Sequence, residues 1–131
     1  MYARFTNVTA TYLFIWGESR SQDMKASTGV DATNSRNFDN SLDATAAGPD
    51  WSTLYTVVND ANSILKNVPN IKFATLANQN RILAEAYTMR AYLYFVLART
   101  WGAVPIVTDP TSGYNASVIY TERSPVADVF T

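Results

Sequence analysis

The residues best suited to chemistry lie around Phe38, in a polar stretch of the chain. Its neighbours in sequence are Arg36, Asn37, Asp39 and Asn40. A flat aromatic ring can stack on the C–H-rich face of a sugar, and amide, carboxylate and guanidinium groups can bond the hydroxyls around it. Phe38 and Asn40 are therefore candidate ligand-binding residues. The alternative is that Phe38 anchors this stretch on neighbouring helices, as a lone aromatic side chain in a loop commonly does.

Catalytic chemistry has little support in the sequence. The 131 residues contain no His and no Cys, which excludes thiol nucleophiles, Ser-His and Cys-His arrangements and Cys/His zinc sites within this chain. Glu18, Asp23 and Asp39 lie near the candidate site, but no spacing fixes the separation that glycoside hydrolysis requires of two carboxylates. The acidic residues also lack the spacing of a calcium loop. We expect a protein that binds rather than catalyses, with no cofactor and no metal.

The hydrophobic pattern predicts a helix on each side of this polar stretch. Apolar residues recur at spacings of three and four over residues 2–16 and again over 49–67, the repeat of an amphipathic helix. Residues 18–48 carry few large apolar side chains and are predicted to form one long polar loop between these two helices. A loop of about 30 residues exceeds most connections, so we expect it to be functional or to pack against parts outside this chain.

The longest predicted helix spans residues 75–101, between a capping Thr75 and Gly102. It carries two seven-residue repeats, one small and one aromatic: Ala84, Ala91 and Ala98, and Tyr87, Tyr94 and Trp101. Small side chains let a neighbouring helix approach closely, and the aromatic stripe is predicted to fill the adjacent groove as part of the core. Arg90 and Arg99 interrupt this surface and are expected to reach solvent or helix partners.

The C-terminal part of the chain is predicted to be extended and then helical again. Residues 103–108 are rich in β-branched side chains and contain a proline, which favours an extended strap lying against the helices. A fourth helix is expected to begin near residue 125, because Ser124, Pro125 and Asp128 supply a cap, a first-turn proline and a first-turn acid. The sequence stops soon afterwards, so we expect the chain to be a fragment of a longer polypeptide.

Charge and hydropathy argue against a nucleic-acid-binding protein and against a membrane-spanning helix. The chain has 10 basic and 11 acidic residues and a net charge of -1, without the clustered basic residues that a nucleic-acid partner requires. Its longest apolar region, residues 87–101, is too short and too charged to cross a bilayer. The first residues also lack the pattern of a signal peptide.

Three motifs occur in order along the chain. Residues 16–23 read WGESRSQD, residues 51–62 read WSTLYTVVNDAN, and residues 84–105 contain AEAYTMRAYLYF followed by WGAVP. They resemble, in that order, the motifs GE.R.D, W..lY..i..aN and AEA..lRAy.Yf.L...wG.vP of the SusD/RagB family of Bacteroidetes outer-membrane nutrient-uptake proteins. Residues 124–130 also fit the helix that follows in that family, so the resemblance covers nearly the whole chain.

The resemblance implies a mainly α-helical fold built on TPR-like antiparallel helix pairs. It makes residues 1–131 a partial N-terminal domain of a longer surface lipoprotein of the outer membrane. Family members work with a TonB-dependent, SusC-like transporter and hold a glycan, or sometimes a peptide, for import. The family's signal peptide and lipid-bearing Cys do not occur in these residues, so we expect membrane association through an anchor outside this chain.

The resemblance also points to site residues. Arg20 and Asp23 belong to the GE.R.D segment and are candidate hydroxyl binders, with a salt bridge or a loop-stapling role as the alternative. Phe38 lies between the helices predicted at 2–16 and 49–67, where family members place some of their sugar contacts. The helix pattern alone would equally permit a TPR-like scaffold that docks a protein partner, and this alternative stays open.

Overall fold

The computed structural model describes residues 1–21, 23, 41, 43, 50–113 and 120–131. They form two compact units, Tyr2–Thr53 and Leu54–Thr131 together with Met1. The described residues are mainly helical and contain no strand beyond one isolated β-bridge, which confirms the mainly α fold class. The TPR-like pairing stays a prediction. Most of the predicted polar loop, with Phe38 and Asn40, lies outside the described residues.

The N-terminal unit begins with one helical segment that changes its winding along its length. Helix α1 (Tyr2–Asn7) leads into a π-helical stretch (Val8–Tyr12) and then into α2 (Leu13–Trp16), where the sequence predicts a plain helix over 2–16. The hydroxyl of Thr9 donates hydrogen bonds to the carbonyl oxygens of Phe5 and Thr6, both at 3.1 Å. Such side-chain bonds compete with the regular backbone pattern, and β-branched residues lower helix propensity here.

Gly17 ends α2 through a close backbone approach. Its N–H donates to the carbonyl oxygen of Leu13 at 2.9 Å. A Cβ atom at position 17 would lie 2.9 Å from the same oxygen, closer than side chains normally come, so glycine fits this turn without strain. A 3-10 turn, Glu18–Arg20, follows directly, and the Ser19 hydroxyl donates to the carbonyl oxygen of Ile15.

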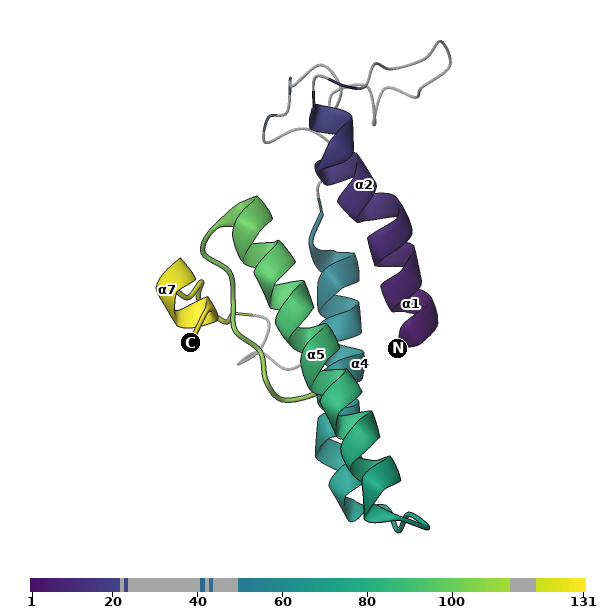
Figure 1. Ribbon diagram of the computed structural model, residues 1–131. Coiled ribbons are helices and arrows are strands. Elements are labelled where there is room, and N and C mark those ends of the chain that lie inside the picture. Colours follow the sequence, from purple (N-terminus) through teal and green to yellow (C-terminus); the bar gives the residue numbers. More distant parts are fainter. Residues whose placement is uncertain (22, 24–40, 42, 44–49, 114–119) are drawn as a thin grey trace. The chain divides into compact units, whose positions relative to one another are not determined.

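The second unit is built on a helical hairpin, shown in Figure 1. Helix α4 (Ser52–Asn67) runs antiparallel to the longer α5 (Leu76–Trp101), and a 3-10 turn (Val68–Asn70) follows α4. Thr75 caps α5, because its hydroxyl oxygen accepts a hydrogen bond from the N–H of Asn78 at 3.3 Å. Gly102 ends α5 with a φ of 74°, a conformation that favours glycine.

Each helix of the hairpin buries one apolar stripe. The buried apolar residues recur at helical spacing: Leu54, Val57, Val58 and Ala61 on α4, and Ala86, Met89, Leu93, Val96 and Leu97 on α5. Burial of such stripes is the main favourable contribution to folding of an amphipathic hairpin. Among the helices of the described part, none is both long and apolar enough to span a membrane.

The predicted alanine and aromatic stripes of α5 are only partly correct. Tyr94 and Ala98 are buried, but Ala84, Ala91 and Tyr87 are exposed. Residues seven apart lie within about 20° of one another around a helix, so the members of each repeat share nearly one side of α5. Their burial therefore differs along the length of the helix: Tyr94 and Ala98, toward its C-terminal end, are buried, and the earlier members are exposed.

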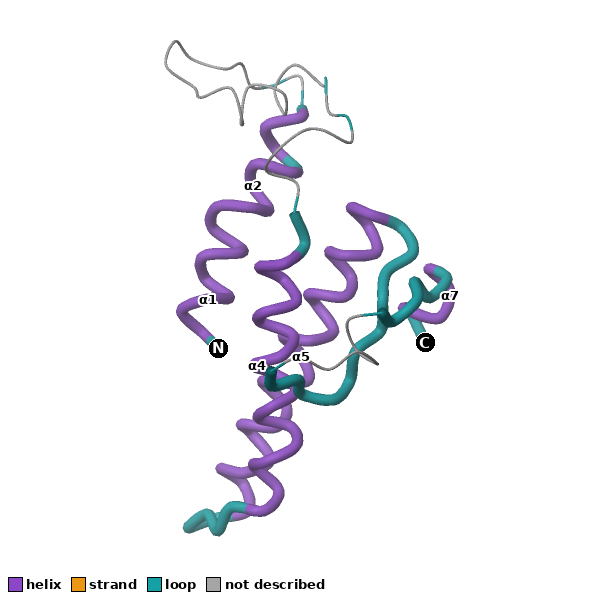
Figure 2. Tube along the Cα trace, turned by 180° about the vertical axis from the view of Figure 1, so that it is seen from behind, coloured by secondary structure: helices purple, strands orange, loops and turns teal. Residues whose placement is uncertain are grey.

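An extended segment follows α5, as the sequence predicts, and we call residues 103–111 the strap. Figure 2 shows it as a teal tube that returns from the C-terminal end of α5 along the hairpin. Val104 and Ser124 form an antiparallel bridge through backbone hydrogen bonds of 3.3 and 2.9 Å. The short helix α7 (Val126–Val129) comes next, and the ring of Phe130 lies edge-on to that of Phe95 on α5, with centroids 6.2 Å apart.

Candidate functional site

Two of the four predicted ligand-binding residues, Arg20 and Asp23, lie in the described part of the chain. Arg20 is the last residue of the 3-10 turn Glu18–Arg20. Asp23 is exposed and lies in a turn. Phe38 and Asn40 fall outside the described residues. The ligand-binding role of all four therefore stays a prediction.

Residues from two of the three sequence motifs do come together, between the hairpin and the strap. Five polar side chains, which we call the clamp, connect the two helices with the strap: Tyr55, Asn59 and Asn62 of α4, and Arg90 and Tyr94 of α5. Except for Arg90, which acts through Asn62, each binds a peptide group of the strap directly. The clamp supplies the hydrogen bonds that an extended segment away from a sheet would otherwise lack.

The two tyrosines bind the first half of the strap. The Tyr55 hydroxyl donates to the carbonyl oxygen of Pro105 at 2.6 Å. The Tyr94 hydroxyl accepts from the N–H of Val107 at 2.7 Å and donates to the carbonyl oxygen of the same residue at 3.0 Å. Their rings meet edge to face, with centroids 6.4 Å apart and an interplanar angle of 85°, a favourable arrangement of two aromatic rings.

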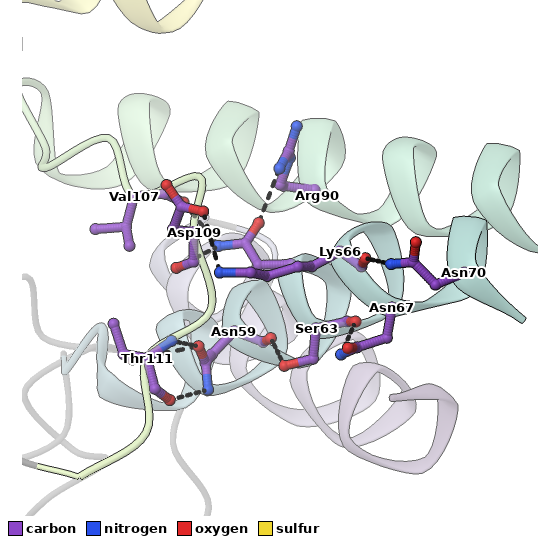
Figure 3. Close-up of polar contacts among 10 residues, drawn as sticks. Asn59, Ser63, Lys66, Asn67, Asn70, Arg90, Val107, Asp109 and Thr111 are labelled. Atoms are coloured by element: carbon purple, nitrogen blue, oxygen red, sulfur yellow. Dashed lines mark hydrogen bonds and ion pairs between the residues drawn. The ribbon is translucent and has the colours of Figure 1, made fainter.

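Asn59 binds the end of the strap in a two-way contact with Thr111, visible in Figure 3. Its Oδ1 accepts from the Thr111 N–H at 2.7 Å, and its Nδ2 donates to the Thr111 carbonyl oxygen at 3.1 Å. Further along α4, the Lys66 ammonium lies 3.7 Å from the carboxylate of Asp109. Both of these side chains are largely exposed, so the ion pair contributes little to stability.

Asn62 is the buried centre of the clamp. Only 1% of it is exposed, and both ends of its amide are bonded. Its Nδ2 donates to the Val107 carbonyl oxygen at 2.9 Å, and its Oδ1 accepts from Nη1 of Arg90 at 2.8 Å. The Arg90 guanidinium also lies over the ring of Tyr87, 5.4 Å from its centroid, which is a cation–π distance. Arg90 thus reaches a helix partner, one of the two places expected for it.

Burial changes the acidity of both clamp tyrosines. It raises the pKa of Tyr55 well above the ordinary value of 10.0, and the neighbouring Tyr94 raises it further. Burial likewise raises the pKa of Tyr94, although the Val107 N–H and Arg90 partly oppose this effect. Removing a proton from either phenol would create a poorly solvated charge and delete a donor to the strap.

We therefore expect the folded chain to lose stability in alkali above about pH 10, because the unfolded state releases the phenolic protons first. The contribution of both tyrosines is fully present below about pH 10 and declines as the pH rises toward their folded-state pKa values. Denaturant melts between about pH 8 and pH 11 measure this slope. The double variant Tyr55→Phe/Tyr94→Phe should flatten it and the exposed Tyr87→Phe should not; an unchanged slope in the double variant would contradict the assignment.

The clamp is built for positioning and not for proton transfer. Its groups are neutral apart from Arg90, and their described polar contacts go to the strap or to one another. Within the described ranges, no three acidic residues lie close enough to hold a metal ion. Sequence reasoning missed the roles of Asn59 and Asn62. The sequence did offer one signal for Asn62: it lies next to Ala61 of the apolar stripe in the 49–67 helix. An asparagine at such a position is expected to be buried, and a buried amide requires hydrogen-bond partners.

Comparison with known proteins identifies the family. A family model of SusD-like proteins, described as "Starch-binding associating with outer membrane", matches residues 4–131. The chain belongs to the SusD-like family. The clamp residues lie in segments 51–62 and 84–105, two of the three that resemble the family's motifs. In this chain, Tyr55, Asn62 and Tyr94 of those segments form hydrogen bonds between the helices and the strap.

Several curated SusD-like proteins are similar to the chain. It is 29% identical over 100 residues to SusD-like protein P38 of Formosa agariphila, a match that covers 75% of this chain and 19% of that protein. SusD-like protein P25 of the same organism is 30% identical over 92 residues, which is 70% of this chain and 18% of P25. A SusD-like protein of Bacteroides ovatus is 37% identical over 70 residues, 52% of this chain and 13% of that protein.

The matched region is a small part of these relatives. The chain spans less than a fifth of the length of each of the three. No solved structure matches the chain.

Proposed function

We propose that the chain is part of a surface-exposed, glycan-binding lipoprotein of an outer-membrane nutrient-uptake system, which delivers its ligand to a TonB-dependent transporter and does not catalyse. One observation carries this proposal: the SusD-like family match extends over residues 4–131, and the family is described as starch-binding and associated with the outer membrane. Within residues 1–131, the lack of His and Cys leaves no Ser-His or Cys-His nucleophile pair.

The clamp narrows the search for ligand contacts. The described polar groups of Tyr94, Asn59 and Asn62 bond the strap or Arg90, so a sugar could take these groups only by displacing the strap. Arg20, Asp23, Phe38 and Asn40 remain the proposed ligand contacts. They combine an aromatic face with side chains that bond hydroxyls, the mixture that glycan recognition uses.

Glycan binding is tested with the protein made from the complete reading frame that contains residues 1–131, because the curated relatives are more than five times as long as the matched segment. Native gels that contain soluble starch or one of a panel of other polysaccharides report binding as retarded migration. We expect retardation by at least one polysaccharide. Migration unchanged across the whole panel would count against glycan binding.

Site variants of the same protein test the proposed contacts. Phe38→Ala should weaken the retardation most, because loss of a stacking ring removes contact area that a hydrogen bond cannot replace. Asn40→Ala, Arg20→Ala and Asp23→Ala should weaken it less. Asn78→Ala, at an exposed position of α5, is the matched control for Asn40→Ala and should bind as the unaltered protein. Full binding by all four site variants would place the sugar elsewhere.

The transporter partnership has its own test. The tagged full-length protein, extracted from outer membranes in mild detergent, should carry a TonB-dependent transporter with it. Loss of glycan binding in Phe38→Ala should leave this co-purification intact, which separates the two activities. Recovery of the tagged protein without any transporter would contradict the partnership while leaving glycan binding in place.

A further inference from the structure

The strap has almost no backbone partner of its own. In the described part of the chain, its only backbone-to-backbone hydrogen bonds are the two that Val104 shares with Ser124. The peptide groups of Pro105, Val107 and Thr111 bond side chains of α4 and α5 instead. The hairpin, in contrast, satisfies its own backbone within its helices. The strap depends on the hairpin, but the backbone bonds of the hairpin do not depend on the strap.

The amide of Asn62 can bind the strap in only one orientation. The carbonyl oxygen of Val107 only accepts hydrogen bonds, so it requires the NH2 end of the amide at 2.9 Å. The guanidinium of Arg90 only donates, so it requires the oxygen end at 2.8 Å. Arg90 therefore selects the orientation in which Asn62 binds Val107. Without Arg90, the described contacts that still favour this orientation are those of Nδ2 with the strap carbonyl oxygens of Val107 and, at 3.5 Å, Asp109.

We infer that the strap opens as a unit separate from the α4/α5 hairpin, and that Asn62, oriented by Arg90, is the positioning residue that keeps it closed. Asn62 lies under the middle of the strap and is 1% exposed. Its loss removes one of the two described donors to the Val107 carbonyl oxygen, leaving the Tyr94 hydroxyl, and takes from Nη1 of Arg90 its partner on α4. Local opening of this kind occurs where a segment contributes few backbone bonds to the rest of the fold.

Amide hydrogen exchange of the complete chain tests this inference residue by residue. The probes are the N–H of Val107, bonded to Tyr94, and the N–H groups of buried positions such as Leu93 on α5. Arg90→Met, which keeps a long apolar stem but has no donor, should speed exchange at Val107 about tenfold or more while Leu93 exchanges as before. Arg90→Lys retains a donor and should restore most of the protection.

Asn62→Leu is the direct variant and should speed exchange at Val107 at least as much as Arg90→Met. Asn67→Leu is the matched control, because Asn67 lies on the same helix and its described side-chain hydrogen bond goes to the Ser63 carbonyl oxygen, at 2.8 Å, and not to the strap. It should leave Val107 unchanged. If Asn62→Leu does not fold, the comparison of Val107 exchange between Arg90→Met and Arg90→Lys tests the inference by itself. Unchanged exchange at Val107 in Arg90→Met, or equal acceleration at Val107 and Leu93, would overturn the inference.

Discussion

Replacing Leu93 by alanine is expected to lower the free energy of unfolding by about 2–5 kcal/mol. Leu93 lies in the middle of α5, and none of its surface is exposed. Truncation removes the transfer free energy of the lost methyl and methylene groups and leaves a cavity that the hairpin can close only in part. Denaturant unfolding at neutral pH, followed by helical circular dichroism, measures the change.

Leu76→Ala is the matched control for this loss, because it makes the same substitution at the first residue of the same helix. Leu76 is 69% exposed, so its truncation should change the free energy of unfolding by no more than about 0.5 kcal/mol. Equal losses at positions 76 and 93 would show that α5 does not bury the stripe assigned to it.

Replacing Tyr94 by phenylalanine is the second large effect that we expect, a loss of about 1–3 kcal/mol in the free energy of unfolding. Tyr94 is 8% exposed, and its ring would remain in place. Its hydroxyl, however, serves both the N–H and the carbonyl oxygen of Val107. Removing it leaves the N–H of Val107 without its described partner, and unpaired buried groups cost more than the hydrogen bond itself provides. Denaturant melts at pH 7 measure this loss.

Tyr87→Phe provides the comparison for Tyr94→Phe. Tyr87 lies two turns earlier on α5, is 55% exposed, and keeps the ring over which the Arg90 guanidinium lies. Its substitution should leave stability nearly unchanged. If Tyr87→Phe and Tyr94→Phe destabilise the chain alike, the hydroxyl of Tyr94 is not a principal contact of the strap.

The sequence was most informative where one local signal decided the structure. The spacing of apolar residues indicated the long helix, and its caps are those that Thr75 and Gly102 predict, since a hydroxyl acceptor and a glycine with positive φ each have a local physical cause. The proline and β-branched residues after Gly102 likewise predicted an extended segment against the helices. These signals act over a few residues, so they can be read without knowing the tertiary structure.

The clamp could not be predicted in this way. Asn62 and Val107 are 45 positions apart in sequence, and nothing local to either residue specifies the other. The prediction that the aromatic repeat is buried failed at Tyr87 for a related reason. Tyr87 and Tyr94 are seven residues apart, but of these two only Tyr94 lies where the strap contacts α5. Which face of a helix is buried depends on what packs against it, and that information is distributed over distant segments.

The way in which α4 and α5 bind the strap has a consequence for how its sequence can vary. What the helices bind at positions 105 and 107 are peptide groups, in one case a carbonyl alone, and every amino acid has a carbonyl. At position 111 they bind the peptide group and also the threonine hydroxyl, which donates to Oδ1 of Asn59 at 3.2 Å. Side chains at intervening positions such as Ile106 and Thr108 can therefore be exchanged without removing these bonds. Positions 107 and 111 each require an N–H, which excludes proline. The hydrogen bonds that hold this segment in place thus come largely from side chains of the two helices beneath it, while its own proline and β-branched residues favour the extended backbone.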